Sequence, residues 1–535
     1  SPFQLMFLGS FAGGCGSWHP IAGKASEGLA RGGAALLSFA SSTVPWYPRA
    51  SDSPGFLMVF SSIAFLFYFL PLFLLAYFAL PFRNAVFLVF SLAFYTLGEG
   101  PHIFLLLACV AYNHRFALLI EKESATRGPS SKRWISIAIA VNLGVLGLFK
   151  YGSFVMVQLA PIIHLFGAQQ LPRWPLALPL GISFFTFHSL SYLIDVYRRD
   201  AKAERNLLAL ALYITMFPQL IAGPIVRFKT IVGELHSRQE TMAGIAEGIR
   251  IFVIGLAQKT LIANTLALPA DRIFQLPVDM VTAPVAWIGA IAYSLQLYFD
   301  FCGYSLMAIG LARALGLHFP RNFDYPYLSK SITEFWRRWH ITLSQWFRDY
   351  VYIPLGGNRE GALTTYRNLV IVFFLCGLWH GAAWTFVIWG LWHGLFLVIE
   401  RMGLGRLLTR LPRPIAHAYA LLVVLIGWVI FRSPDFHHAS NYLQIMAGLG
   451  HPGPTSFGAS WFLTTDVVLA FIAGFIGSLP TFPWITAHLA RWSESAFLPR
   501  LLIAGASVAL PLGLLVLCTM TLALGSYNPF LYFRF

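Results

Sequence analysis

Charged residues are scarce in this sequence. Asp, Glu, Lys and Arg make up 11% of its 535 residues, whereas hydrophobic residues make up 57%. A soluble domain contains about 25% charged residues, so the composition excludes an ordinary soluble domain and predicts an integral membrane protein. Lys and Arg outnumber Asp and Glu by 37 to 22, but they lie in short loops between apolar runs. We interpret these as cytoplasmic loops under the positive-inside rule and expect no nucleic-acid partner.

Cysteine and the common catalytic signatures are also lacking. The 5 cysteines are scattered, form no CxxC motif and lie mostly in apolar runs, so no disulfide framework is expected. No Cys/His cluster has the spacing of a zinc site, and we predict no metal. The sequence contains no Walker A, GxSxG, HExxH or EF-hand pattern, which excludes the commonest phosphate, esterase and metal mechanisms.

Long apolar runs dominate the sequence from Met58 onward. Several are shorter than the roughly 20 residues that a complete membrane span needs, and Gly and Pro interrupt others. Short and broken segments indicate an all-α polytopic protein with broken and re-entrant helices around an internal cavity. The runs cover residues 59–79, 85–99, 102–120, 134–158, 176–197, 207–225, 246–265, 283–298, 301–316, 367–380, 382–400, 416–431, 465–483 and 500–525.

Residues 1–57 differ from the rest of the chain. They are rich in Gly, Ala and Ser and contain no run long enough to span a membrane. We expect them to be a mis-assigned or disordered N-terminal extension, and residues 58–535 to form one membrane domain. Two charged segments, 121–133 and 198–206, are separated by two expected spans. They should therefore share one side, which their Lys and Arg content predicts to be cytoplasmic, with Met58 outside.

The most polar and aromatic segment covers residues 334–359. Placed on a helix, it puts Trp336, His340, Ser344 and Phe347 on one face, while Glu334 and Arg338 fall four residues apart and can pair. An arginine costs roughly 2.5–3.5 kcal/mol at the centre of a bilayer, and the segment also contains Arg337 and Arg348. We therefore predict an interfacial or re-entrant helix, with His340 at an internal cavity.

Two further histidines lie in the apolar run LCGLWHGAAWTFVIWGLWHG. Ionisable groups within a membrane are functional by default, and histidine exchanges protons near neutral pH. We predict that His340 and His380 act as a pair, against the alternative that both only bond to loops and helix ends. On one unbroken helix, His393 would point about 220° away from His380. The two rings could therefore line one site only if the helix broke at Gly381, and we predict that His393 is structural.

Three other groups of polar residues have structural interpretations. His188 and Asp195 lie seven residues apart on one expected helix face and are assigned to a hydrogen-bonded core. The segment FPQLIAGPI (217–225) indicates a broken helix whose backbone groups need partners. Asp300, between two apolar runs, is expected to pair with a nearby arginine, and a role as general base is the less favoured alternative.

A set of motifs, taken in order, resembles one family. The motifs are GISFFTF, IDVYR, FPQLIAGPI, YFDFCGYS, NFDYPYLSKSITEFWRRWHITLSQWFRDYVYIPLGGNR, GLWHGAAWTF and YNPFLYFRF. From Met58 to Phe535 the sequence resembles the membrane-bound O-acyltransferase (MBOAT) family, and within it the alginate O-acetyltransferase (AlgI) type. The resemblance implies a ring of tilted and broken helices around a thinned centre crossed by a tunnel.

The resemblance also implies the site residues and the substrates. His380 of the WHG motif and His340 of the WRRWH motif would be catalytic, and Trp336, Trp339, Trp379, Arg337 and Ser344 would line the tunnel. The donor would be a cytoplasmic thioester, acetyl-CoA or another acyl thioester, with no bound cofactor. Acetyl would pass to a periplasmic acetyl-transfer protein or polysaccharide from the bacterial inner membrane.

We therefore predict a membrane O-acetyltransferase that modifies an exported, alginate-like polysaccharide. One alternative is D-alanyl transfer to teichoic acid, whose donor is a carrier protein. An alternative of another class is a proton-coupled transporter or polysaccharide channel, with the histidines as proton relays. The sequence leaves open the polysaccharide, the partner, the oligomeric state and the choice between direct transfer and an acyl-enzyme.

Overall fold

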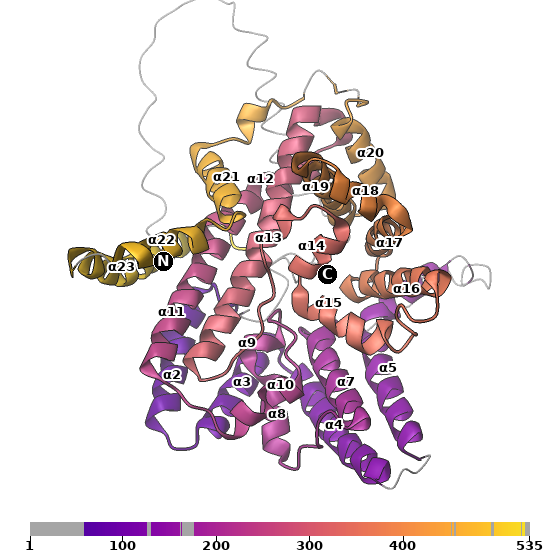
Figure 1. Ribbon diagram of the computed structural model, residues 1–535, viewed down its shortest axis with the longest axis vertical. Helices are drawn as coiled ribbons and strands as arrows, with labels where there is room; N and C mark the ends of the chain where they lie inside the picture. The colour runs from indigo at the N-terminus through magenta and orange to yellow at the C-terminus, as the bar shows by residue number, and fades with distance from the viewer. Residues whose placement is uncertain are drawn as a thin grey trace, which may run out of the picture. The chain divides into compact units, whose positions relative to one another are not determined.

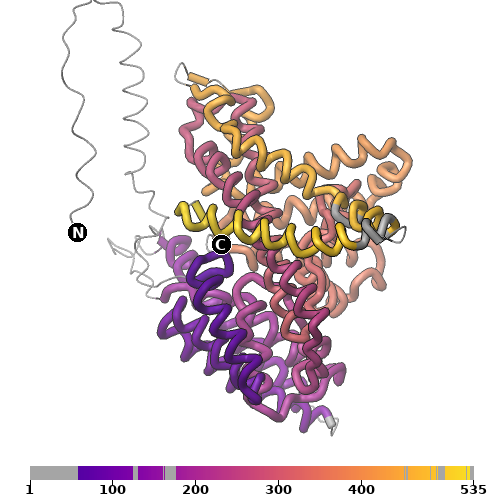
Figure 2. The backbone as a smooth tube through the Cα atoms, turned by 90° about the vertical axis from the view of Figure 1, so that its left-hand side faces the viewer, coloured from indigo at the N-terminus to yellow at the C-terminus, as the bar shows by residue number. Residues whose placement is uncertain are grey.

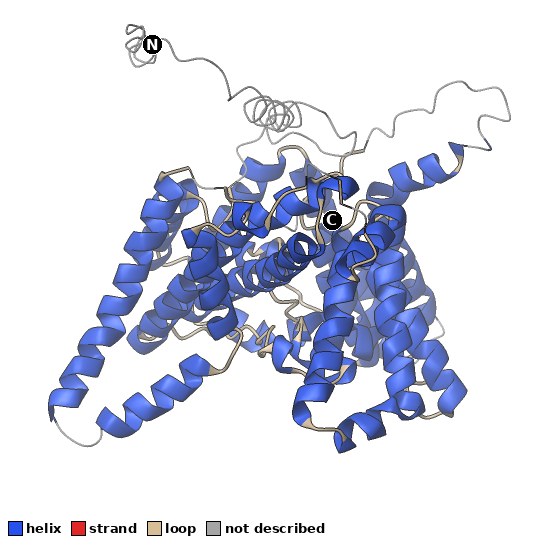
Figure 3. Cartoon of the chain, turned by 90° about the horizontal axis from the view of Figure 1, so that it is seen from above, coloured by secondary structure: helices blue, strands red, loops and turns tan. Residues whose placement is uncertain are grey.

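The computed structural model describes residues 58–125, 130–160, 162, 176–450, 452–453, 456–493, 497–525 and 527–529. The predicted N-terminal extension, 1–57, lies outside these residues. Within the described part of the chain all regular structure is helical, as Figure 3 shows. The all-α prediction is therefore confirmed.

Among the described residues, eight helical stretches are long and apolar enough to cross a membrane. Two shorter apolar helices, Phe65–Ala79 and Thr465–Gly477, accompany them. The mixture of complete and short segments agrees with the predicted multi-pass protein with broken helices. The eight stretches are His102–Ser124, Ser130–Gln158, Met242–Gln275, Ala283–Ala314, Ala362–His380, Trp384–Arg410, Arg413–Arg432 and Leu501–Ala523.

The first part of the chain forms a group of helices that are coloured indigo to magenta in Figure 1. Its two charged connections touch: Arg205 forms an ion pair with Glu121, and the amide of Ala203 donates to the same carboxylate at 2.9 Å. The prediction that segments 121–133 and 198–206 share a side is thus confirmed. The helices are η1 (Phe65–Phe69), α2 (Leu70–Ala79), α3 (Arg83–Glu99), α4 (His102–Ala125), α5 (Ser130–Gln158), α7 (Ile182–Arg198), α8 (Leu207–Thr215), α9 (Phe217–Leu220) and α10 (Phe228–His236).

The segment FPQLIAGPI is broken, as predicted. After α8, α9 makes a single turn, and the chain then runs without regular structure to Arg227. The freed backbone groups find side-chain partners, as buried backbone must. The amide of Ile225 donates to Thr342 Oγ1 at 3.0 Å, and the Gln219 side chain donates to the carbonyl of Tyr213.

A single long helix, α13 (Ala283–Ala314), occupies the middle of the described unit (Figure 1). The sequence predicted two segments here, divided at Asp300, and this division is wrong. Asp300 can continue the helix because Lys259 Nζ lies 2.7 Å from its carboxylate. Among the described residues, the ion-pair partner of Asp300 is thus this lysine, where an arginine was expected. Lys259 belongs to the π-helical turn η2 (Gln258–Ala263), which joins α11 (Met242–Ala257) to α12 (Asn264–Gln275).

Glycines allow α11 and α13 to approach closely. A Cβ atom at Gly303 would lie 2.6 Å from the carbonyl oxygen of Gly255, and one at Gly310 would lie 2.6 Å from that of Gly248. Small residues at such crossings bring two backbones together where lipid provides no hydrophobic driving force. The backbones of α11 and α13 are therefore in direct contact at these glycines.

The remaining elements are two short helices before the polar segment, the polar segment itself and the helices that follow it. Figure 2 shows α23, in yellow, lying across the bundle, where Thr260 of η2 donates to Cys518 Sγ at 3.1 Å. The elements are η3 (Val278–Met280), η4 (Pro326–Leu328), α14 (Ile332–Arg338), α15 (Ile341–Phe347), η5 (Arg348–Tyr352), α16 (Ala362–His380), α17 (Trp384–Ile399), η6 (Glu400–Leu404), α18 (Gly405–Arg410), α19 (Arg413–Arg432), α20 (Phe436–Met446), η7 (Ala459–Trp461), α21 (Thr465–Gly477), α22 (Thr481–Ser493) and α23 (Phe497–Ala523).

Candidate active site

The polar segment is two short helices rather than one. α14 ends at Arg338, Trp339 is extended, and His340 adopts a left-handed backbone conformation with φ of 41°. That conformation is strained for a residue other than glycine and persists only where the surroundings impose it. The predicted continuous helix is therefore wrong, although Arg338 does pair with Glu334 at 2.9 Å.

The loop residue Asn322 imposes the break. Its backbone oxygen accepts a hydrogen bond from the amide of Ile341 at 2.8 Å. Its side-chain oxygen accepts from the hydroxyl and the amide of Thr342, at 2.9 and 3.3 Å. The same oxygen lies 3.0 Å from His340 Nδ1. Asn322 thus fixes both the backbone and the ring of His340.

These contacts determine the tautomer of His340. The side-chain oxygen of Asn322 carries no hydrogen and therefore only accepts hydrogen bonds. Nδ1 of His340 must donate to it, so Nδ1 carries the imidazole proton. The ring is 1% exposed, and Nε2 has no hydrogen-bond partner within the described part of the chain. A neutral ring with this tautomer presents a free lone pair on Nε2, which is the arrangement of a proton acceptor.

His380 is the last residue of α16. Gly381 continues in an extended conformation, and α17 begins at Trp384. The ring of His380 is surrounded by aromatic rings, with centroids at 4.7 Å from Trp379, 4.9 Å from Trp389 and 5.3 Å from Phe431. The helix break therefore places an imidazole among apolar side chains at the end of a membrane-embedded helix.

The structure brings His340 and His380 together. The ring of Trp379 lies against both, with its centroid 6.1 Å from that of His340 and 4.7 Å from that of His380. Two motifs that are about forty residues apart in sequence thus meet around one tryptophan.

Lys150 and Tyr151 of α5 reach the same place, and the sequence reasoning missed them. Lys150 Nζ lies 3.2 Å from the carbonyl oxygen of His380, and the Tyr151 hydroxyl donates to the carbonyl of Leu378. A signal was present, because Lys150 is an isolated cation inside the apolar run 134–158, and intramembrane charges mark functional sites.

The other predicted tunnel residues lie at varied positions. Trp336 is buried, with its ring 5.0 Å from that of Phe373, and Trp339 is buried, with its ring 4.9 Å from that of Trp428. Arg337 is exposed. Ser344 is partly buried and donates to the carbonyl of Trp339 at 3.5 Å. Of the five residues, Trp379 alone is in ring contact with both His340 and His380.

His393 is separated from His380 by the ring of Trp389, which contacts both histidines. The helix ends at His380 and the chain is extended at Gly381. The rings of His380 and His393 are therefore not held on opposite faces of one unbroken helix. The ring of His393 is fully buried and lies 5.2 Å from Trp389, which also contacts His380. Its ring centroid also lies 5.3 Å from that of Trp336, 6.1 Å from that of Phe335 and 6.4 Å from that of Trp428. His393 thus packs among aromatic rings, in keeping with a structural role.

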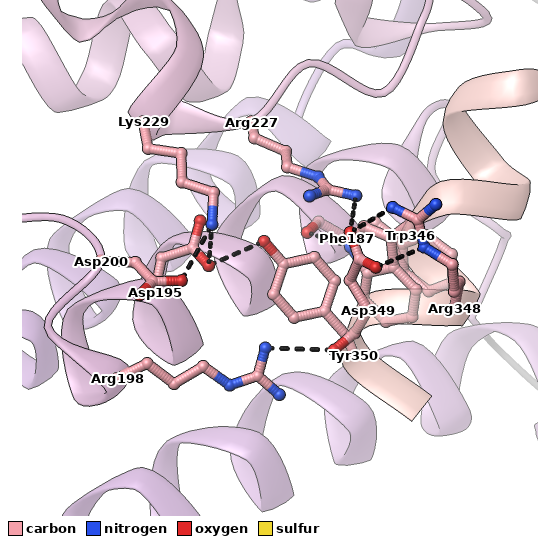
Figure 4. A network of polar contacts seen from close by, with 10 residues as sticks. All are labelled: Phe187, Asp195, Arg198, Asp200, Arg227, Lys229, Trp346, Arg348, Asp349 and Tyr350. Carbon is pink, nitrogen blue, oxygen red and sulfur yellow. Dashed lines mark hydrogen bonds and ion pairs between the residues drawn. The ribbon is translucent and has the colours of Figure 1, made fainter. Parts of the chain in front are cut away.

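A polar network anchors the end of the segment to α7 and α10 (Figure 4). Trp346 Nε1 donates to the carbonyl of Phe187 at 3.1 Å, and the ring of Phe187 stacks on both Trp346 and Trp379, at 3.8 and 5.5 Å. The network therefore joins the surface to the ring beside the histidines. Its ion pairs and hydrogen bonds are Tyr350–Asp195 (2.9 Å), Lys229–Asp195 (3.2 Å), Lys229–Asp200 (3.0 Å), Arg227–Asp349 (2.8 Å), Arg348–Asp349 (2.6 Å) and Arg198 to the Asp349 carbonyl (3.1 Å).

Asp195 and His188 have different surroundings. Asp195 belongs to the network, so the prediction of a hydrogen-bonded core is confirmed for it. His188 is fully buried near Tyr213, at 5.8 Å between ring centroids. Neither of its ring nitrogens has a hydrogen-bond partner among the residues that the structure describes.

Two further features complete the surroundings. No group of three or more His, Cys, Asp or Glu side chains among the described residues is placed to hold a metal ion. A pocket of about 380 Å³ opens beside the start of α14, and neither His340 nor His380 lines it. Its lining consists of Lys330, Ser331, Thr333, Glu334, Glu400, Arg401, Gly405, Leu408 and Thr409.

Comparison with known proteins gives a consistent result. The profile of the membrane-bound O-acyltransferase family matches residues 133–429. A protein of Azotobacter vinelandii named probable alginate O-acetylase AlgI is 41% identical over 89% of this chain and 100% of its own length. The Pseudomonas aeruginosa protein of the same name is 46% identical over 74% of this chain and 75% of its own length. The peptidoglycan O-acetyltransferase of Helicobacter pylori is 36% identical over 74% and 80%.

Proposed function

Since the chain belongs to the membrane-bound O-acyltransferase family, we propose that it transfers acetyl from a cytoplasmic thioester to an exported cell-surface polysaccharide. Its relatives are named for the O-acetylation of alginate and of peptidoglycan, which supports a membrane O-acetyltransferase that acts on polysaccharide. The proposed donor is acetyl-CoA or another acyl thioester, and the proposed location is the bacterial inner membrane.

The meeting of His340 and His380 around Trp379 carries the proposal. In direct transfer, a hydroxyl oxygen attacks the thioester carbonyl, the new C–O bond forms and the C–S bond breaks. His380 accepts the hydroxyl proton and returns it to the departing thiolate. General base catalysis of this kind contributes typically 10²–10⁴-fold.

His340 has a supporting role in this mechanism. Its Nε2 lone pair is free and its Nδ1 proton is held by Asn322. The ring can therefore orient the donor or share the proton that His380 accepts. If acetyl instead rests transiently on His380, the same lone pair activates the hydroxyl in the second step.

The acceptor side completes the proposal. Acetyl leaves through a tunnel beside Trp336, Trp339 and Trp379 and reaches a periplasmic acetyl-transfer protein or the polysaccharide itself. The buried tryptophans favour such a path because their rings exclude water, and water would otherwise hydrolyse the activated ester.

The test measures acetyl esters on the cell-surface glycan by mass spectrometry. We compare cells with the wild-type gene, cells without it, and cells with His380→Ala or His340→Ala. We expect His380→Ala to abolish the esters, because the proton acceptor is gone, and His340→Ala to reduce them at least tenfold. His437→Ala, at an exposed histidine that contacts Asn441, is the matched control. Wild-type acetylation by correctly inserted His380→Ala protein contradicts the proposed role of His380.

A donor test separates the proposal from its alternatives. Purified protein is given either acetyl-CoA or a D-alanyl-loaded carrier protein. Turnover of acetyl-CoA supports acetyl transfer, whereas turnover of the loaded carrier alone supports D-alanyl transfer to teichoic acid. Proton-coupled flux through reconstituted vesicles without any acyl transfer would support the transporter alternative.

A further inference from the structure

The end of α16 lies inside the site, and its last carbonyl groups need hydrogen-bond donors. Leu378, Trp379 and His380 are the final residues of the helix, and Gly381 leaves it in an extended conformation, with φ of −171° and ψ of 161°. The last four carbonyl groups of an α-helix have no intrahelical N–H partner. In a buried, apolar place an unpaired carbonyl is unfavourable. Donors must come from another element.

One turn of α5 supplies these donors. The Tyr151 hydroxyl donates to the carbonyl of Leu378. The Lys150 ammonium donates to the carbonyl of Trp379 and, at 3.2 Å, to that of His380. Two adjacent residues therefore bond to the carbonyls of three successive residues, the last of which is the proposed general base.

The charge of Lys150 matches this position. The side chain is 8% exposed, its ammonium lies 5.9 Å from the centroid of the Trp379 ring, and it also contacts Ser183 Oγ at 3.5 Å. None of the described carboxylates forms an ion pair with it. A helix carries partial negative charge at its C-terminal end, which favours a nearby cation. The end of α16 thus acts as the counter-charge of Lys150.

We propose that Lys150 is a positioning residue for His380. By bonding to the carbonyls of Trp379 and His380, it fixes the direction in which the His380 side chain leaves α16 and so aims the imidazole at the reacting hydroxyl. The inference rests on the proposed function for its kinetic consequences only. In the competing interpretation the ammonium binds a phosphate or the carbonyl of the donor directly.

Amide hydrogen exchange tests the positioning without any activity. In solubilised protein, Lys150→Met should speed exchange in the peptide that covers residues 377–385 at least tenfold, because the last turn of α16 loses its donors. Lys150→Arg should stay near wild type. Tyr442→Phe, which removes a buried hydroxyl that donates to the carbonyl of Ala286 at 2.8 Å, should leave this peptide unchanged.

Tyr151→Phe provides a milder variant of the same test. It removes one of the donors and should speed exchange in the same peptide by a smaller factor. If Lys150→Met does not yield folded protein, this variant decides the outcome. Wild-type exchange in Tyr151→Phe and in every folded Lys150 variant overturns the proposal.

Steady-state kinetics with acetyl-CoA separate positioning from substrate binding. Misaligning a catalytic group costs about 10²-fold in rate, so Lys150→Met should lower kcat by about that factor and leave the donor KM within about twofold. Lys150→Arg should restore at least a tenth of wild-type kcat. A large rise in donor KM with unchanged kcat overturns positioning in favour of donor binding. Inactive wild-type protein contradicts the proposed function but leaves the exchange result intact.

Discussion

One side chain, that of Asn322, provides the hydrogen bond to the ring of His340. Asn322 accepts hydrogen bonds from the imidazole and from Thr342 through one oxygen, and all three residues are buried. Removing an acceptor from such a place leaves its donors unsatisfied, at a cost of about 1–3 kcal/mol. Asn322 therefore fixes the direction of the His340 ring through hydrogen bonds, as Lys150 is proposed to do for the His380 ring.

We predict that Asn322→Ala lowers kcat at least tenfold, because the His340 ring loses the contact that fixes its tautomer and direction. The measurement is the rate of acetyl transfer per folded molecule. Asn113→Ala is the control, because Asn113 is also buried but bonds to Cys109 and Asn142, away from the histidines. Equal losses of activity in the two variants would mean that Asn322 only stabilises the fold.

At the residue scale, candidate residues were easier to select than their geometry. His340 and His380 were selected because ionisable groups are rare in apolar runs, and their catalytic roles stay predictions. The same reasoning applied to Lys150 would have selected it too. Asn322 gave no such signal. The role of Asn322 depends on the left-handed backbone conformation of His340, eighteen residues later. No local propensity predicts that conformation.

At the element scale, the end of the polar segment is tied down by charge. Arg348 and Arg227 both donate to the carboxylate of Asp349, at 2.6 and 2.8 Å. Partial burial raises the pKa of Asp349, but the hydrogen bonds from these two arginines outweigh burial and hold the pKa below its ordinary value of 3.8. The ionised form of Asp349 thus helps to hold η5 against the rest of the protein.

This pKa shift predicts a pH dependence of stability. Because the folded pKa is lowered, the stabilisation is complete above the ordinary pKa of the carboxyl and is lost as pH falls through the lower folded value. We expect the thermal unfolding midpoint of wild-type protein to fall more steeply below about pH 4 than that of Asp349→Asn. Asp466→Asn, at an exposed site in α21, should follow the wild-type curve. Parallel curves for wild type and Asp349→Asn would contradict the argument.

Helix breaks were predicted where glycine or proline marked them and missed elsewhere. The interruption at 217–225 was predicted from its prolines and glycine, and a break at Gly381 was left as an open alternative, which the structure realises. The break at His340 was missed because contacts with a distant loop impose it. In α13 a break was predicted where the helix is continuous. A charged residue, Asp300, suggested a boundary between two apolar runs, and its partner Lys259 lies on another helix, which the sequence does not reveal.

At the scale of the whole molecule, the buried pair of Lys259 and Asp300 connects the central helices. The two side chains are 2% and 5% exposed. Lys259 also donates to Asn264 at 2.7 Å and to the carbonyl of Pro529. Removing one member of a buried ion pair typically costs about 3–5 kcal/mol, because the other charge is left uncompensated.

We predict that Asp300→Asn lowers the free energy of unfolding by about 3–5 kcal/mol, because it removes the carboxylate that forms an ion pair with the buried Lys259 ammonium. The measurement is denaturant unfolding of solubilised protein. The double variant Lys259→Met with Asp300→Leu should recover part of this loss, because no buried charge remains. A double variant less stable than Asp300→Asn would show that packing, rather than charge, governs this site.

The general architecture followed from composition and run length, whereas the tertiary contacts did not. A multi-pass, all-α protein with broken segments is what a chain with 11% charged residues and interrupted apolar runs must form. Which helices meet is decided by close approaches such as Gly255 with Gly303. Such pairings cannot be read from one sequence.

The segment Tyr527–Pro529 has a consequence for biogenesis. The Tyr527 hydroxyl donates to Asp271 at 2.7 Å, and the Asn528 side chain donates to the carbonyl of Ser61 at 3.1 Å. These residues leave the ribosome after every helix described above. The hydrogen bonds to Asp271 and to Ser61 can therefore form only after all the helices described above have been synthesised.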